Sequence, residues 1–378
     1  MSAVRKIKSY LTQEGEVVFV DPDETHIPLL RQFNPAFRVR SAPPPSDFCP
    51  NLQRTRAIRI GLSRQTLTEA DDEALWGIHA DGLAGRLRNA LDGSVTLLDV
   101  KVELARREFL DCRLCGHRCG VNRFLTPGKC GLKEKAYVAE TFVHVGEEVV
   151  ITPAGTIKLY QCAMNCAGCH AWEVIHQREA IMAKTGQILD EAAWKTCENF
   201  DRAATIEIVG GNPTESLLPV LKAMVGMPPR LWKKPLVWND HGYTMPISYD
   251  LLHGIVDIYL PDFKGCDACV EKISKVTGYW ECVTTGIKRM LKQHARIIVR
   301  ILVLPGHVGC CHAPTLLWLS QYRDRLWVSL LPFIPDYRAL KDPELNRRTS
   351  VTEMAEVKAL VREAGLRDVD EQAVGFWT

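Results

Sequence analysis

Between residues 150 and about 335, short apolar runs alternate with longer stretches of helical periodicity. The apolar runs read TIKLYQC, ATIEIVGGNP, PLVWND, IVDIYLPDFK, RIIVRILVLPG and LWVSLLPFIP, and helical stretches such as DEAAWKTCENFD and TESLLPVLKAM lie between them. Strands that alternate with helices favour parallel βαβ units. Because each run ends in polar or glycine residues, we expect an α/β fold, a partial (β/α)6 barrel of the TIM type, with its site at the carboxyl ends of the strands.

The segments on either side of this alternation have a different character. The first hundred residues contain the strand-like runs EVVFV and RAIRIGL and one long helical stretch, without a catalytic motif. A cysteine-rich segment follows that has too few apolar residues to form a core of its own. We therefore predict an N-terminal α/β accessory unit at 1–100, a cysteine-rich metal-binding segment at 101–150, the partial barrel at 151–335 and a closing segment at 336–378.

The closing segment contains SVTEMAEVKALVREAGL, which carries both a start and a stop signal for a helix. Ser350 and Glu353 form a capping box, and Gly365 follows the last apolar position. The apolar positions that share one helical face are Met354, Val357, Leu360 and Val361. We expect this face to pack on the barrel.

Composition places the chain among ordinary globular proteins. It has 378 residues, of which 46% are apolar and 24% charged, and its net charge is +2. So small a charge indicates neither nucleic acid nor an anionic membrane as a partner. The chain lacks a run of about 18 apolar residues and the apolar core of a signal peptide. We therefore expect a soluble, cytoplasmic protein.

The 14 cysteines are the unusual feature of the composition, and most of them are clustered. In a cytosolic chain of this length, clustered cysteines hold metal more often than they form disulfides. Cys49 and Cys197 stand alone and are predicted to be inert buried thiols. The clusters are Cys112, Cys115, Cys119 and Cys130; then Cys162, Cys166 and Cys169; then Cys266, Cys269 and Cys282; and finally Cys310 and Cys311.

The second cluster lies in YQCAMNCAGCHAWE, directly after the first predicted strand of the barrel. Three thiolates on one tight loop can ligate three irons of a 4Fe–4S cluster. The fourth iron then has no protein ligand and can bind a substrate, as the open position of a catalytic zinc site does. The alternative is a zinc knuckle with a distant fourth ligand such as His170.

The next two predicted strands end in groups that suit a bound cofactor, which favours the iron–sulfur cluster. The second strand ends in VGGNPTES, where Gly210 and Gly211 let the backbone approach a ligand closely. The third ends in WND, where Asn239 and Asp240 offer polar groups for a ribose or an amide. Three such loops on successive strands form a consistent set.

These motifs resemble those of a known superfamily. CAMNCAGC resembles the CxxxCxxC motif of radical S-adenosylmethionine (SAM) enzymes, and GGNPT resembles their GGE-type motif, with Asn212 where Glu is usual. From about 97 to 368 the chain is similar to the uncharacterised branch related to pyruvate formate-lyase activating enzymes, in segments such as LLDVKVELARREFLDCRLCGHRCGVNR, GYTMPISYDLLHGIVDIYLPDFK and NRRTSVTEMAEVKALVREAGL. HAWEVIH after the third cysteine and the five cysteines from Cys266 onward depart from that pattern.

The resemblance implies a radical SAM type of partial barrel and a reaction. The open iron of a reduced 4Fe–4S cluster binds SAM and cleaves it reductively, giving methionine and a 5′-deoxyadenosyl radical that abstracts hydrogen from a protein, peptide or small-molecule substrate. A donor such as flavodoxin or ferredoxin supplies the electron. One alternative is an activase specific for a glycyl radical enzyme. Another, of a different class, is a zinc or iron–sulfur protein with a structural or electron-transfer role and no SAM turnover.

The resemblance also implies roles for residues at the strand ends. Cys162, Cys166 and Cys169 would hold the cluster. The predicted SAM-binding residues are Gly210, Gly211 and Asn212 for the methionine amine, Asn239 or Asp240 for the ribose, and Arg300 for the carboxylate. Arg300 lies within IIVRILV, where a buried charge is costly unless it is paired. Predicted catalytic residues are Asp262 and Lys264 in LPDFK and His307 in LPGH.

The remaining cysteines suggest further metal sites. Four thiols at Cys112, Cys115, Cys119 and Cys130 can fill a tetrahedral zinc site or bind all four irons of a second cluster, and both remain open. Either site is closed, hence structural or electron-relaying. Cys266, Cys269 and Cys282 with Cys310 or Cys311 form an additional site on the barrel rim, or else are unrelated thiols.

Overall fold

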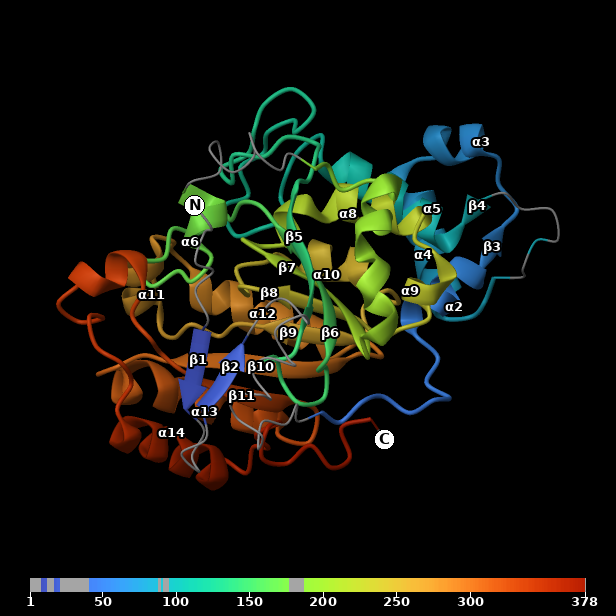
Figure 1. Ribbon diagram of the computed structural model, residues 1–378. Coiled ribbons are helices and arrows are strands. Elements are labelled where there is room, and N and C mark those ends of the chain that lie inside the picture. Colours follow the sequence, from blue (N-terminus) through green and yellow to red (C-terminus); the bar gives the residue numbers. More distant parts are fainter. Residues whose placement is uncertain are drawn as a thin grey trace, which may run out of the picture.

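A seven-stranded sheet forms the centre of the computed structural model, which describes residues 8–11, 17–20, 41–87, 90, 95–176 and 187–377 (Figure 1). The strands lie in the order β11-β10-β9-β8-β7-β6-β5. Their bounds are β5 Val138–His144, β6 Ala154–Leu159, β7 Thr205–Gly210, β8 Leu236–Asp240, β9 Ile258–Pro261, β10 Arg296–Val303 and β11 Trp327–Pro332.

Strands β6 to β11 pair in parallel with their neighbours in chain order. In this register Leu159 lies opposite Gly210, and Asp240 lies opposite Pro261, so the carboxyl ends of the strands meet at one edge. The mixed α/β class and the six parallel strands are as expected. The sequence did not predict β5, which runs antiparallel to β6. Because β5 and β11 are the edge strands of this open sheet, its curvature into a partial barrel stays a prediction.

Helical connections lead from the carboxyl end of each parallel strand to the amino end of the next (Figure 1). They comprise α6 Trp172–His176 and η2 Glu191–Arg202; η3 Thr214–Ser216, α8 Leu217–Val225 and α9 Pro229–Trp232; α10 Pro246–Leu252; α11 Asp267–Ser274 and α12 Tyr279–Met290; and η4 Val308–His312, α13 Ala313–Leu319 and η5 Ser320–Tyr322. In the described part of the chain, none of the helices has both the length and the apolar character needed to cross a membrane.

The two faces of the sheet bury different side chains because successive residues of a strand point to opposite faces. One face packs residues such as Trp238, Tyr259 and Val299 into the large core that also holds the helices. On the other face, the residues nearest the amino ends are apolar and pack with Val149–Ile151 and the C-terminal Phe376. Further along the same strands that face turns polar, and this change places a cavity at the carboxyl ends.

The N-terminal region contributes helices to the large core. They are α2 Asn51–Ala57, α3 Arg64–Glu69, α4 Asp72–Leu83 and α5 Leu97–Glu108, with the short strands β3 Arg59–Ile60 and β4 Val95–Thr96 between them. Leu52, Leu75 and Leu104 belong to the same hydrophobic cluster as the residues of β7 and α8. The two-stranded pair β1 Lys8–Leu11 and β2 Val17–Val20 matches part of EVVFV. The domain boundaries stay predictions.

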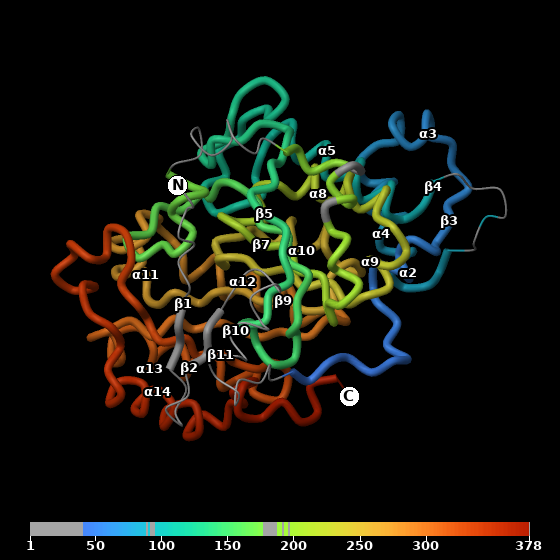
Figure 2. The backbone as a smooth tube through the Cα atoms, viewed as in Figure 1, coloured from blue at the N-terminus to red at the C-terminus, as the bar shows by residue number. Residues whose placement is uncertain are grey.

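The C-terminal end of the chain packs on both faces of the sheet, with α14 in the large core and Phe376 in the cluster on the other face. Helix α14, Val351–Glu363, begins with the predicted capping box and ends before Gly365, whose φ is 67°. Its residues Val357 and Val361 are buried, as predicted for the face that packs on the barrel. Beyond it the chain returns to the segment at 41–50, where the Trp377 indole N–H donates to the Ala42 carbonyl over 2.9 Å (Figure 2).

Candidate functional site

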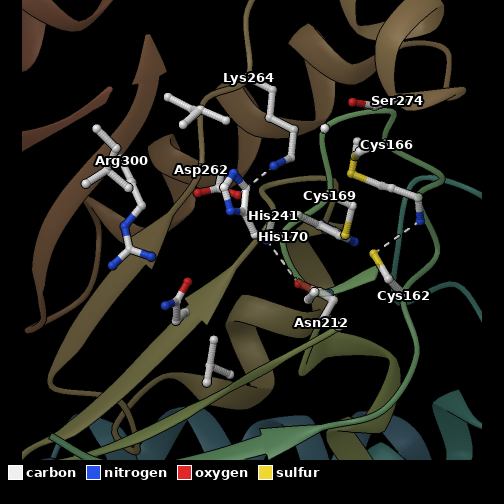
Figure 3. Close-up of a pocket in the computed structure, with 18 of the residues that line it drawn as sticks. Cys162, Cys166, Cys169, His170, Asn212, His241, Asp262, Lys264, Ser274 and Arg300 are labelled. Carbon is white, nitrogen blue, oxygen red and sulfur yellow. Dashed lines mark hydrogen bonds and ion pairs between the residues drawn. The ribbon is translucent and has the colours of Figure 1, made fainter. Parts of the chain in front are cut away.

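A cavity of ≈ 470 Å³ lies at the carboxyl ends of the parallel strands (Figure 3). Each loop that the sequence singled out contributes to it, because the parallel register brings the strand ends together. The predicted residues that line it are Cys162, Cys166, Cys169, Gly210, Gly211, Asn212, Asn239, Asp240, Asp262, Lys264 and Arg300.

The loop that carries Cys162, Cys166 and Cys169 directly follows β6, and Figure 3 shows their sulfur atoms facing a common space. The backbone N–H of Met164 donates to the Cys162 sulfur over 3.3 Å. Burial and the neighbouring Glu215 raise the pKa of the Cys162 thiol, and burial and Cys166 raise the pKa of Cys169 to about 11. Since metal ligation requires thiolates, the three sulfurs need a positively charged centre, and an iron–sulfur cluster fits this donor set.

The zinc-knuckle alternative lacks a compact ligand set. Among the described residues, the groups of three or more potential ligands within 4.8 Å of one another do not combine this cysteine triplet with His170. Instead His170 lies edge-on to Phe333, with ring centroids 6.5 Å apart. Within the part of the chain that the structure describes, the group that includes Cys162 joins it to Glu215 and His241, so the predicted zinc site with His170 has no compact ligand set.

A buried hydrogen-bond network supports the cysteine loop from behind. The Glu215 carboxylate accepts from the Ala163 backbone N–H over 3.0 Å and from His241 Nε2 over 3.1 Å. His241 Nδ1 accepts from the Tyr243 N–H, so Nε2 carries the proton. The Asn212 amide donates to Glu215 over 2.5 Å, and its oxygen accepts from the His241 backbone N–H. Sequence reasoning missed Glu215 and His241, although both lie within two to three residues of predicted ones.

The two glycines after β7 are required by packing against the cysteine loop. Gly210 has φ 145°, and a Cβ at Gly211 would lie 1.9 Å from the Gln161 carbonyl oxygen. The Gly211 N–H donates to the Leu159 carbonyl, and the Asn212 N–H donates to Gln161. The close packing of β6 and its following loop therefore already requires glycine at both positions. Contact of this segment with the methionine amine of SAM stays a prediction.

Asp240 serves the protein itself. Its carboxylate accepts from the Tyr249 hydroxyl and the Thr244 hydroxyl, each over 2.9 Å, and from the Gly242 N–H over 3.2 Å. Asp240 and Asn239 both line the cavity, and a contact of either with a ribose stays a prediction.

Arg300 also has partners within the chain. Its guanidinium bonds Glu147 over 2.5 Å and Glu148 over 2.8 Å. This buried charge is paired with carboxylates of the loop after β5, and its contact with the SAM carboxylate stays a prediction. Beside it, Asn239 donates to Glu207 over 2.8 Å. Arg300, Glu147 and Asn239 line the cavity and form its polar floor, and Glu207, which does not line it, holds Asn239 through this hydrogen bond.

Asp262 and Lys264 form an ion pair on the cavity wall, with Nζ and Oδ2 2.6 Å apart. Burial opposes the charge on Lys264, but Asp262 and then Cys166 outweigh it and hold the pKa of the lysine above its ordinary value. A cation therefore lies next to the cysteine loop. His307 was predicted at the cavity mouth, but it is not among the lining residues, and its Nδ1 lies 3.4 Å from the Cys310 sulfur.

The first cysteine cluster gathers around Gly128 and a buried arginine. A Cβ at Gly128 would lie 3.3 Å from the Cys130 sulfur and 3.5 Å from that of Cys119. Arg123, 1% exposed, places Nη1 3.6 Å from the Cys112 sulfur. A buried guanidinium beside these thiols suits the negative charge of a metal–thiolate centre, whether zinc or iron–sulfur. Cys115, the fourth predicted ligand, is also buried.

The third cluster has a membership different from the predicted one. The sulfurs of Cys266 and Cys311 lie 3.7 Å apart, those of Cys269 and Cys310 3.8 Å, and those of Cys310 and Cys311 3.8 Å. Cys282 is not in this group. It lies on α12, where burial raises the pKa of its thiol.

Comparison with known proteins identifies one close relative. No known family model matches the sequence. A solved structure of TYW1 with a lysine-pyruvate adduct bound is 15% identical at a TM-score of 0.33, over 55% of this chain and 73% of that one, a likeness too slight to support a conclusion. The uncharacterized protein MJ0674 of Methanocaldococcus jannaschii is 33% identical over 275 residues, 71% of this chain and 80% of the archaeal protein. The chain therefore belongs to the same protein family as MJ0674.

Proposed function

We propose that this protein is a radical SAM enzyme that binds a 4Fe–4S cluster through Cys162, Cys166 and Cys169. One observation carries the proposal. Three thiols from a single loop face a cavity of ≈ 470 Å³ at the carboxyl ends of parallel strands, so a ligand in the cavity lies against the metal centre. That volume is within the usual range for small-molecule sites, about 300–1,000 Å³.

When bound, the cluster and SAM supply the one-electron chemistry that yields a hydrogen-abstracting 5′-deoxyadenosyl radical. The chain's own residues position and protect the reactants. Lys264 provides a positive charge beside Cys166, which offsets the negative charge of the thiolates. Glu215, His241 and Asn212 hold the cysteine loop in place through buried hydrogen bonds.

We propose that the reacting group of the substrate lies over the polar floor of the cavity. That floor consists of Arg300 paired with Glu147 and of Asn239, which donates to Glu207. Polar groups that already have partners suit an uncharged or hydrogen-bonding group of the substrate. We propose hydrogen abstraction from such a group, with SAM and a flavodoxin- or ferredoxin-like electron donor as partners. An activase for a glycyl radical enzyme is the narrower form of this proposal.

The test uses anaerobically purified protein. We expect brown protein with about four irons from the triplet site, and formation of 5′-deoxyadenosine and methionine when dithionite and SAM are added. Iron-free, colourless protein would instead support the structural zinc alternative and refute the proposal. Protein, peptide and small-molecule substrates are then distinguished by transfer of deuterium from labelled candidates into 5′-deoxyadenosine.

A further inference from the structure

Four cysteines from two distant segments meet near the cavity wall. Cys266 and Cys269 lie at the start of α11, after β9, and Cys310 and Cys311 lie in η4, after β10. The three sulfur–sulfur distances that link them are 3.7, 3.8 and 3.8 Å. The pairs are too far apart for disulfide bonds, which measure about 2.05 Å.

These three distances match three of the six edges of one metal tetrahedron. A zinc–thiolate bond is about 2.3 Å long, and the corners of a regular tetrahedron are about 1.6 times that far apart, which gives about 3.8 Å. A four-iron cluster places each cysteine on a different iron and so spreads its sulfurs more widely. We infer that Cys266, Cys269, Cys310 and Cys311 bind a single tetrahedral Zn²⁺ ion.

The backbone around these cysteines lets the two segments approach closely. Cys266 is the N-cap residue of α11, and Cys269 lies in the first turn of that helix. Gly265 has φ 126°, and a Cβ there would lie 2.7 Å from the Cys311 sulfur, so only glycine permits this approach. The first turn of a helix favours a thiolate, because its free N–H groups carry partial positive charge.

His307 is the rival fourth ligand. Its Nδ1 lies 3.4 Å from the Cys310 sulfur and 3.9 Å from that of Cys311, and together with Cys269 these atoms lie within 4.8 Å of one another. Cys266 lies outside that group of four, although its sulfur is 3.7 Å from that of Cys311, and with it the ligand set consists of sulfur alone. We therefore assign His307 to a hydrogen bond with the metal-bound Cys310 sulfur.

The zinc ion would position the proposed iron–sulfur loop through helix α11. Cys266 and Cys269 fix the first turn of this helix. At its other end, the carbonyl of Ser274 accepts from the Asn165 N–H over 3.1 Å, and that of Ile273 accepts from the Ala167 N–H over 2.8 Å. Asn165 and Ala167 flank Cys166, so the helix joins the two metal sites. This role rests on the proposed function, whereas zinc binding itself does not.

The first experiment measures zinc in the purified wild-type protein and in a Cys269→Ser/Cys310→Ser double variant. We expect the double variant to lose one zinc per chain, while Cys282→Ser and His307→Ala keep the wild-type content. X-ray absorption at the zinc edge should show sulfur ligation at about 2.3 Å. The inference is overturned if the double variant keeps the wild-type zinc content, if His307→Ala loses the ion, or if iron occupies the site.

A second experiment uses folded wild-type protein and so does not depend on the stability of a variant. Cys310 is exposed, yet bound zinc should slow its alkylation at least about tenfold until a chelator is added. Rapid alkylation without chelator overturns the inference.

Triplet variants (Cys162, Cys166 and Cys169 to Ala) should keep this zinc, which separates the present inference from the proposed function. Zinc removal should also speed hydrogen exchange at the Asn165 and Ala167 amides, whereas unchanged exchange would refute the link through α11.

Discussion

The cysteine loop after β6 and the four-cysteine group at α11 present the same side chain in two different arrangements. Cys162, Cys166 and Cys169 come from one loop and face a cavity, so a metal centre bound there would have an open side. The four-cysteine group joins segments 45 residues apart, with sulfurs within 3.8 Å of their neighbours. An open donor set permits chemistry, whereas a closed one stabilises structure. The number and direction of the sulfurs distinguish the two.

The largest predicted effect breaks the open site alone. Replacing Cys166 with Ala removes one of three iron ligands, so we expect iron content to collapse and 5′-deoxyadenosine formation to fall by about three orders of magnitude or more. Zinc at the four-cysteine group should remain. Iron and zinc analysis and a timed product assay measure this, with Cys197→Ala as the buried-cysteine control. Retention of activity in Cys166→Ala would contradict the assignment of the open site.

A moderate effect is expected from the charge next to the open site. Lys264→Met removes the cation beside Cys166. If its charge interaction stabilises the reacting state by about 1.5–3 kcal/mol, SAM cleavage should slow about 10- to 100-fold. It should also shift the cluster reduction potential to more negative values, because reduction adds negative charge. Lys358→Met, at the ion pair with Glu371 on the C-terminal region, is the control. Equal effects of the two substitutions would show that Lys264 is a structural residue.

The smallest effect concerns the pH dependence of stability, which we expect to depend on Glu207 beside the cavity floor. Burial, and then Glu147, raise the pKa of Glu207 from 4.5 to about 7. Between those values the folded state binds more protons than the unfolded state, so stability falls as pH rises through this window. Glu207→Gln can keep hydrogen bonds to Asn239 and Thr156. It should reduce the pH-dependent change in the free energy of unfolding by about 1–3 kcal/mol. Denaturant melts at pH 5 and 7.5 measure it, with the exposed Glu140→Gln as control.

Local patterns predicted those parts of the site that lie within one loop. The apolar runs identified each parallel strand, and polar residues at their ends marked the cavity wall, including Asp262 and Lys264. The buried strand also showed that Arg300 needs a partner. The partners themselves, Glu147 and Glu148, lie in the loop after β5, a strand that the sequence pattern did not predict.

Pairings between distant segments escaped sequence reasoning for the same physical reason. The spacing of the cysteines does not distinguish Cys311 from Cys282 as a ligand. The contact between the start of α11 and η4 brings Cys311 to Cys266 and leaves Cys282 out of the group. Glu215 looks like an ordinary helix-start carboxylate in the sequence. Its role became visible once His241, from the next strand end, was found to donate to it.

The apolar cluster under the sheet ties the end of the chain to its centre. Phe376 packs there with Val149–Ile151 and with strand residues such as Val237 and Leu260. The last residues of the chain thus complete the lower layer of the protein and shield that side of the sheet from water.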